Sequence, residues 1–90
     1  MNQRYSILLT ESAERDLGKL DTHVAKRIIS KLRTYEADES PFRHAKQLKG
    51  PKDTYRFRIG DYRAIFEVQS DGTPIILVVL CIRHRKDVYR

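Results

Sequence analysis

The first half of the chain changes from a strand-like to a helix-like pattern of apolar positions. Residues 5–9 form a short apolar run, which predicts a first strand. From residue 11 onward, apolar residues recur every three or four positions, the period of a helix with one buried face. The spacing predicts helices over 11–19 and 22–37, and Pro41 cannot continue the second one. The apolar face of the two helices consists of Ala13, Leu17, Leu20, Val24, Ile28, Leu32 and Tyr35.

The second half of the chain has the period of two that a half-buried strand requires. Apolar and polar residues alternate over 55–59 and over 62–69, and Gly60-Asp61 between them suits a two-residue hairpin loop. Residues 75–83 form a two-sided apolar run, which predicts a last, buried strand. Residues 42–54 lack a period, so we expect a polar, basic connection there. The predicted fold is α+β, with two N-terminal helices packed on a small, mostly antiparallel sheet in the order β-α-α-β-β-β.

The predicted hairpin places like charges opposite each other. If residues 60–61 form the loop, Arg58 lies directly opposite Arg63, and the alternation puts Arg56 on the same face. Opposed like charges destabilise a sheet, so the arrangement predicts an anion that binds between exposed guanidinium groups. The alternative is a solvated face whose charge is neutralised by nearby acidic residues, namely Asp61, Glu67 and Asp71.

The last predicted strand brings a further arginine toward this pair. Counting alternate positions puts Arg83 on the same face as Leu77, Val79 and Cys81. If this strand neighbours the hairpin, Arg83 can lie beside Arg58 and Arg63. The sequence does not give the register between the strands, so this remains conditional.

The size and cysteine content of the chain predict one small intracellular domain. Ninety residues allow a single, moderately buried core, and we expect residues 1–90 to form one domain. No window approaches the ~18 uninterrupted apolar residues of a membrane helix, and residues 1–4 do not lead into a signal-peptide core. The single cysteine, Cys81, cannot form an internal disulfide, which predicts a reducing, cytoplasmic environment.

The formal net charge of +6 is concentrated in one internal segment. Residues 1–42 are neutral, whereas residues 43–58 carry six basic side chains against one acidic one. A basic segment that runs into a strand predicts a face for a polyanion, although an interaction tail can have a similar composition. Candidate nucleic-acid contacts in this segment and after the last strand are Lys46, Lys49, Lys52, Arg56, Arg85 and Lys86.

The C-terminal residues carry groups that suit cleavage of a phosphodiester. Arginines, a lysine, a histidine and a tyrosine follow the last strand, and such groups hold phosphate, move protons and stack on bases. Two flanking arginines disfavour protonation of His84, which makes it a candidate general base. RNA can supply its own 2′-hydroxyl as the nucleophile. The chain contains no CxxC or HExxH spacing and no glycine-rich phosphate loop, so we expect neither a metal nor another cofactor.

Three segments, in this order and at this spacing, resemble the RelE/ParE superfamily of toxins and specifically the RelE-like mRNA interferases. They are residues 48–50 (Leu-Lys-Gly), 55–63 (from Tyr55 to Arg63) and 82–90 (from Ile82 to Arg90). The resemblance covers nearly the whole chain. It implies the fold predicted above, cleavage of mRNA in the ribosomal A site, and inhibition by a cognate antitoxin, a separate chain that wraps the toxin.

The resemblance also implies roles for individual residues. By position, Arg63 resembles the arginine that stabilises the transition state, and Arg83 the arginine proposed to protonate the leaving oxygen. Tyr89 matches the C-terminal tyrosine that stacks on or orients the nucleotide. Arg56 and Arg58 fall where members carry basic residues, in some cases a lysine proposed as the general base, but the arginine at position 58 stays protonated. Either His84 is the base in this chain, or charge stabilisation dominates.

Two other functions are compatible with the same pattern. ParE-type toxins share the fold, poison DNA gyrase and lack the RNase cluster, whereas this chain retains Arg63, Arg83 and Tyr89 together. A non-catalytic module that binds RNA or the ribosome through residues 43–58 is the third hypothesis. All three would bind polyanions, so charge alone does not separate them.

Overall fold

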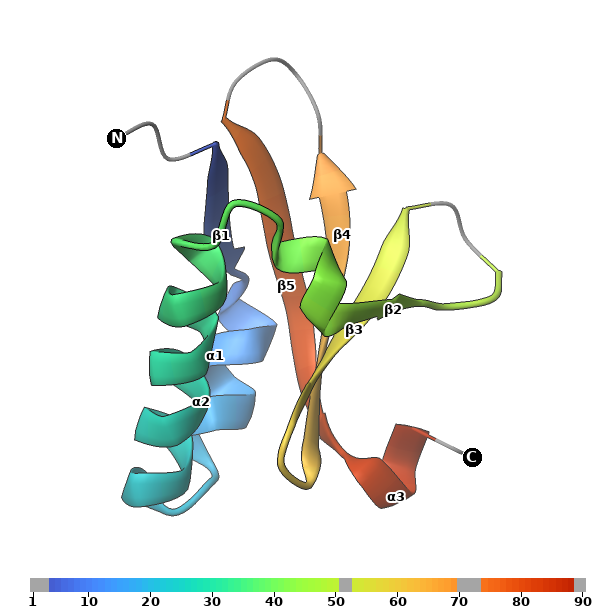
Figure 1. Cartoon of the computed structure of the whole chain (residues 1–90). Coiled ribbons are helices and arrows are strands. Elements are labelled where there is room, and N and C mark those ends of the chain that lie inside the picture. Colours follow the sequence, from blue (N-terminus) through green and yellow to red (C-terminus); the bar gives the residue numbers. More distant parts are fainter. Residues whose placement is uncertain (1–3, 51–52, 70–73, 89–90) are drawn as a thin grey trace.

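Two helices cover one face of a five-stranded sheet in the computed structural model, which describes residues 4–50, 53–69 and 74–88 (Figure 1). The predicted α+β fold is confirmed. The predicted connection over residues 42–54 also contains a 3-10 helix and a short strand, and a helical turn follows the last strand. In chain order the elements are β1 (Tyr5–Leu9), α1 (Glu11–Gly18), α2 (Thr22–Glu36), η1 (Pro41–His44), β2 (Ala45–Gln47), β3 (Thr54–Ile59), β4 (Tyr62–Gln69), β5 (Ile75–His84) and α3 (Arg85–Val88).

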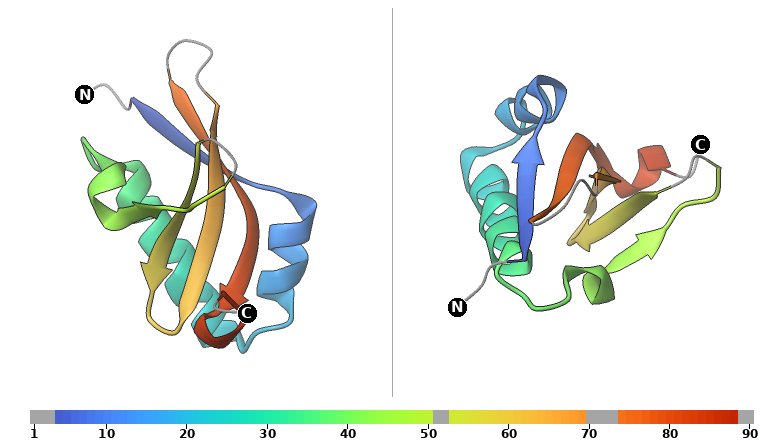
Figure 2. Two further views of the ribbon diagram at one scale, coloured as in Figure 1. Left: turned by 90° about the vertical axis from the view of Figure 1, so that its right-hand side faces the viewer. Right: turned by 90° about the horizontal axis from the view of Figure 1, so that it is seen from above.

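Strand β5 pairs with the N-terminal strand β1 on one edge and with β4 on the other. The strand order is β1-β5-β4-β3-β2, and β1 runs parallel to β5 while the other pairs are antiparallel (Figure 2). Helices α1 and α2 lie on one side of the sheet, whereas α3 lies on the other side (Figure 1). We call the side that carries α3 the outer face. None of the helices in the described ranges is both long and apolar enough to cross a membrane.

The β3–β4 hairpin has the predicted two-residue loop. Ile59 pairs with Tyr62, and Gly60 between them has a φ of +61°, a left-handed conformation that glycine adopts without strain. Arg58 therefore pairs with Arg63, as the spacing predicts. The register turns Phe57, Ala64 and Phe66 toward the helices, and all three are buried.

A bulge in β5 changes the side to which its residues point. Ile65 pairs with Cys81 but the next residue, Phe66, pairs with Val79, so Leu80 is an extra residue on β5. Leu77 and Val79 consequently lie in the core, and each is fully buried. The prediction that they share a face with Arg83 is wrong, because one extra residue reverses the alternation between Val79 and Arg83.

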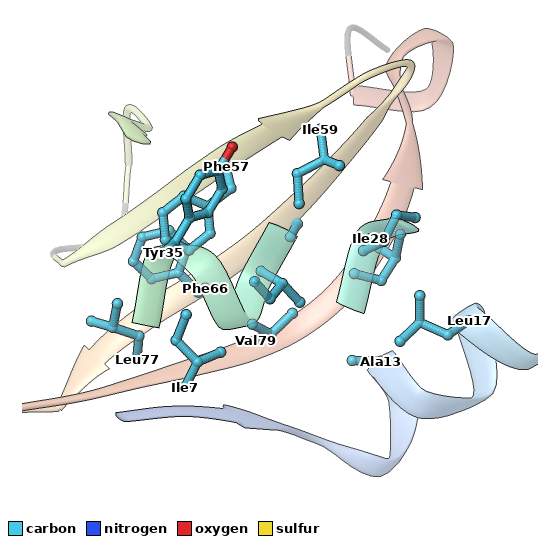
Figure 3. Packing of buried hydrophobic residues seen from close by; sticks show 13 residues of the cluster. Ile7, Ala13, Leu17, Ile28, Tyr35, Phe57, Ile59, Phe66, Leu77 and Val79 are labelled. Carbon is cyan, nitrogen blue, oxygen red and sulfur yellow. The ribbon is translucent and has the colours of Figure 1, made fainter. Parts of the chain in front are cut away.

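The core lies between the two helices and the sheet (Figure 3). Its centre is aromatic, because the rings of Phe57 and Phe66 stack with centroids 4.3 Å apart and Tyr35 packs against Phe57 at 4.8 Å. This packing fixes α2 against the hairpin and thereby fixes the outer face of the same strands. The buried apolar residues are Ile7, Ala13, Leu17, Ile28, Leu32, Tyr35, Phe57, Ile59, Ala64, Phe66, Leu77, Val79 and Ile82.

A polar cluster around Asp38 fixes the connection between α2 and β2. The Asp38 carboxylate accepts hydrogen bonds from the Ser40 backbone N–H and from Arg43, each at 2.9 Å, and its other oxygen lies 2.9 Å from His44 Nε2. The His44 ring stacks on Tyr35. The Ser40 amide, followed by His44 and Arg43, holds the pKa of Asp38 well below its usual range.

We predict that Asp38 contributes to stability at neutral pH and that acid removes the contribution. Its contribution is complete above the ordinary carboxyl pKa of 3.8 and decreases as the pH falls toward the lower pKa of the folded state. Asp38→Asn should therefore unfold at a lower temperature at pH 7 and lose less stability between pH 5 and pH 2 than the unmodified chain. Thermal unfolding by circular dichroism, with Glu39→Gln as the control, measures this. Identical acid profiles for all three proteins would contradict it.

Candidate functional site

Three arginines lie in one line across the outer face of the sheet. Arg63 on β4 pairs with Arg58 on β3 and with Arg83 on β5, and we call these three residues the arginine row. Directly opposed side chains on a sheet have Cβ atoms ~5 Å apart, so the row concentrates three positive charges in a short distance. The bulge in β5 is what brings Arg83 into this line. The row is the most concentrated basic feature among the described residues.

Arg63 is buried, which corrects the prediction that both hairpin guanidinium groups are exposed. Only 3% of its surface is accessible, and its Nη1 donates to the carbonyl oxygens of Gly60 and Tyr62, each at 3.0 Å. The reason is the C-terminal turn, because α3 contacts β4 and β5 and its first residue donates from Arg85 N to Asp61 O at 2.7 Å. The sequence pattern at the C-terminus does not show that α3 packs on this face.

The buried guanidinium group is only partly satisfied. Among the described residues, Arg63 Nε is buried without a hydrogen-bond partner, and no carboxylate pairs with Arg63. A buried cation without an opposite charge destabilises a fold unless another group compensates it. A buried donor without a partner likewise costs about 1–3 kcal/mol. An anionic ligand that reaches Nε would remove both penalties.

The other two members of the row differ in how they are held. Arg83 is about half-exposed, and its Nη1 donates to the Asp16 carboxylate at 3.1 Å. Arg58 is exposed, and no described carboxylate forms an ion pair with it. The row therefore combines one fixed central donor, one donor anchored by a carboxylate and one exposed cation.

A second basic pair lies beside the row. Lys46 on β2 pairs with Arg56 on β3, Arg56 pairs with Ile65 on β4, and Ile65 pairs with Cys81 on β5. Burial raises the pKa of the Cys81 thiol and Arg83 opposes this effect only in part, so the thiol stays protonated. Cys81 thus acts as a small apolar neighbour of the row.

The other basic candidates that the structure describes lie at exposed positions. Lys49 follows β2, and Arg85 and Lys86 lie on α3, where Arg85 Nε approaches Asp61 Oδ1 at 3.8 Å. Such an exposed pair contributes little to stability. Lys52 and Tyr89 are outside the described residues.

His84 is the candidate that the structure separates from the arginines. It pairs with Tyr62 on the side that faces the helices, with ring centroids 5.3 Å apart at 87°. Its Nδ1 accepts a hydrogen bond from the Lys86 backbone N–H at 3.2 Å. Together with residues of α2 it lines a cavity of about 230 Å³ whose lining is Val24, Arg27, Ile28, Ile59, Asp61, Tyr62 and His84. The alternation along β5 therefore places His84 on the opposite face of the sheet from the row.

Asp16 is a site residue that the sequence pattern did not indicate. It lies on α1, 67 positions before its partner Arg83, and no local spacing links the two. Its polar position next to buried Leu17 on a helix resembles that of any surface carboxylate. Within the described ranges, no three His, Cys, Asp or Glu side chains gather in a way that could hold a metal ion.

Comparison with known proteins relates nearly the whole chain to bacterial and archaeal toxins. Residues 7–89 match the model of a family described as the ParE toxin of the type II toxin-antitoxin system, parDE. Toxin RelG of Mycobacterium tuberculosis is 29% identical over 87 residues, which cover 96% of this chain and 97% of the relative.

Two solved structures agree with this result. The toxin-antitoxin complex RelBE2 of M. tuberculosis contains a chain with a TM-score of 0.77 and 28% identity, and the match covers 91% of this chain and 99% of that one. A chain of the RelB-RelE antitoxin-toxin complex from Methanococcus jannaschii is 30% identical with a TM-score of 0.66, over 91% and 94% of the two chains. The resemblance to the RelE/ParE superfamily is thereby confirmed.

We predict that the row lowers stability when no anion is bound. Arg58→Gln removes the charge directly opposite Arg63 and should raise the free energy of unfolding by about 0.2–1 kcal/mol. The gain should shrink as salt screens the repulsion. Urea unfolding at low and high salt measures it, with Lys49→Gln as a control that removes the same charge outside the row. Equal effects of the two substitutions would show that only net charge matters.

Proposed function

The chain belongs to the ParE toxin family of type II toxin-antitoxin systems, and we propose that it is an endoribonuclease that cleaves mRNA in the ribosomal A site. The observation that supports this proposal most is the arginine row with the unpartnered Nε of buried Arg63 at its centre. A scissile phosphate placed there would supply the negative charge and the hydrogen-bond acceptor that the fold does not provide for Arg63. Toxin RelG and a putative RelE-like toxin protein of Escherichia coli match this chain over 97% and 90% of their own lengths.

The proposed reaction uses the 2′-hydroxyl of the RNA as nucleophile and needs no metal. Attack on the adjacent phosphorus, with loss of the 2′-hydroxyl proton to water, forms a phosphorane with extra negative charge on its equatorial oxygens. The P–O5′ bond then breaks, which leaves a 2′,3′-cyclic phosphate and a 5′-oxygen that takes up a proton from water. Donors that are already oriented toward this charge lower the barrier, because they do not reorganise during the reaction. Arg63 fits this role, since two carbonyl oxygens fix its Nη1, and its buried Nε would gain a partner if a phosphate displaced the groups that cover it.

The flanking arginines have distinct proposed roles. Arg83 lies at the β5 end of the row, and we assign it to the leaving oxygen, where its charge stabilises the negative charge that develops as the bond breaks. Arg58 supplies charge from the other side, and it remains protonated and therefore does not act as a base. His84 faces the helices, so the rate rests on charge stabilisation and orientation of the RNA.

Basic residues around the row are proposed to hold the RNA backbone. Lys46 and Arg56 continue the positive surface along the sheet, and Lys49, Arg85 and Lys86 are exposed basic residues. Lys52 is assigned to the RNA from the sequence alone. We assign Tyr89 to stacking on or orienting the nucleotide, on the basis of the family resemblance. Phosphate contacts of this kind position a nucleic acid without reading its sequence.

An antitoxin is the proposed protein partner. The structures similar to this chain include toxin chains bound to RelB antitoxins. For this chain we propose an antitoxin segment that is rich in apolar and acidic residues, because such a segment covers apolar surface and basic charge together.

Poisoning of DNA gyrase is the second candidate function. It is favoured by the description of the matching family, which names ParE. The arginine row favours RNA cleavage instead, since a toxin that only binds gyrase has no need for a buried arginine donor aimed at a phosphate. A non-catalytic module that binds RNA or the ribosome would retain the surrounding lysines without requiring Arg63.

We predict that Arg63→Ala and Arg83→Ala each slow mRNA cleavage on the order of 100-fold or more, as loss of a transition-state donor does. Primer extension on ribosome-bound mRNA after addition of toxin measures the rate. Lys26→Ala, which removes an exposed charge from α2 on the other side of the sheet, should cleave normally. No cleavage by the unmodified toxin, together with loss of gyrase supercoiling activity, would favour the second candidate.

We predict that His84→Ala retains most of the cleavage rate, within about threefold, because its ring points away from the row; a general base would contribute about 100-fold or more. The same primer-extension assay, repeated from pH 5.5 to pH 8, tests the prediction. A large loss of rate in the variant, together with a wild-type rate that falls as histidine becomes protonated, would identify His84 as the base.

A further inference from the structure

The carboxylate of Asp16 connects α1 to the strand that carries Arg83. Its Oδ2 accepts a hydrogen bond from the Ile82 backbone N–H at 2.9 Å and another from Arg83 Nη1 at 3.1 Å. The side chain of Asp16 is 19% exposed, whereas that of Arg83 is 46% exposed. One oxygen of Asp16 thus contacts both the backbone of β5 and the side chain of Arg83.

The sheet explains why a carboxylate is placed there. Strand β1 ends at Leu9, which pairs with Val79, so β5 continues beyond its parallel neighbour. The next polar groups along that edge are satisfied by α1 and its cap, because the Thr10 hydroxyl donates to Leu80 O and Asp16 accepts from Ile82. Burial of Ala13 and Leu17 on the same helix fixes its rotation and therefore the position of Asp16.

The contact with Arg83 goes beyond the requirements of that strand edge. A neutral acceptor would satisfy the Ile82 N–H, but a carboxylate also forms a charge-assisted bond to the guanidinium group. A free arginine side chain has several rotatable bonds, and anchoring one nitrogen restricts the directions of the others. Arg63 is held comparably by carbonyl oxygens, so two members of the row are fixed through Nη1.

We propose that Asp16 is a positioning residue for Arg83, which holds the guanidinium group in line with Arg63 so that its free nitrogens meet the reacting phosphodiester. The inference rests on the proposed function. It implies that loss of Asp16 lowers the cleavage rate but does not weaken the binding of RNA. Asp16 carries a negative charge beside the RNA site, so its loss removes orientation from Arg83 without weakening attraction for the polyanion.

Single-turnover cleavage of ribosome-bound mRNA at increasing toxin concentration tests the proposal. Asp16→Asn keeps an oxygen that can accept from Ile82 and should lower the maximum rate about 10-fold, because a misplaced group loses its catalytic geometry. The toxin concentration at half-maximum rate should stay unchanged or fall. Glu14→Gln, which removes an exposed carboxylate from the same helix, should match the unmodified toxin in both values.

Two further variants separate positioning from a structural role. Asp16→Glu keeps the charge and should retain more of the rate than Asp16→Asn, although both should unfold near the temperature of the unmodified toxin. In an Arg83→Ala background, followed over long time courses, Asp16→Asn should cause no further loss of rate, because the residue that it positions is already gone.

The outcomes distinguish this inference from the function on which it rests. Absence of cleavage by the unmodified toxin would overturn both. Cleavage that depends on Arg83 but is as fast in Asp16→Asn as in Glu14→Gln would overturn only the role of Asp16. An equal 10-fold loss with and without Arg83 would also overturn it, since Asp16 would then act through the fold or another residue.

Discussion

The pairing of β5 with β4, including the extra residue Leu80, is the constraint on which the other features depend. Strand β5 receives the N-terminal strand on one edge and the hairpin on the other, so it unites the two halves of the chain. Before the bulge its alternate residues fill the core. After the bulge the alternation is reversed, which buries Ile82 and turns Arg83 to the outer face. A regular strand would not allow both placements.

The two faces of the hairpin have opposite energetic roles. On the inner face, stacked Phe57 and Phe66 pack beneath α2 and stabilise the sheet. On the outer face, opposed arginines and an incompletely satisfied guanidinium group lower its stability. The proposed function accounts for this combination, because donors fixed in advance for a phosphate are unfavourable when the phosphate is absent. The packed core makes the unfavourable face possible in a chain of 90 residues.

Much of this architecture is predictable because it depends on local patterns. Gly60 and Asp61 determine the hairpin loop, and the period of two then determines that Arg58 faces Arg63. The bulge is not predictable in this way, because one extra residue within an apolar run leaves the composition of the run unchanged. Burial of Arg63 depends on how α3 packs, and the contact between Asp16 and Arg83 joins residues that no local pattern relates. The short β2 strand has three residues, too few to show a period.

The central claim is that the arginine row receives a phosphate, and side-chain NMR tests it most directly. Arginine Nε–Hε resonances are followed while the toxin is titrated with a short RNA whose 2′-hydroxyls are methylated, which prevents cleavage by 2′-attack. The account predicts saturable shifts for Arg63 and Arg83, and slower hydrogen exchange at Arg63 Nε as it gains a partner. Shifts confined to arginines of α2, with Arg63 unchanged at saturation, would contradict it.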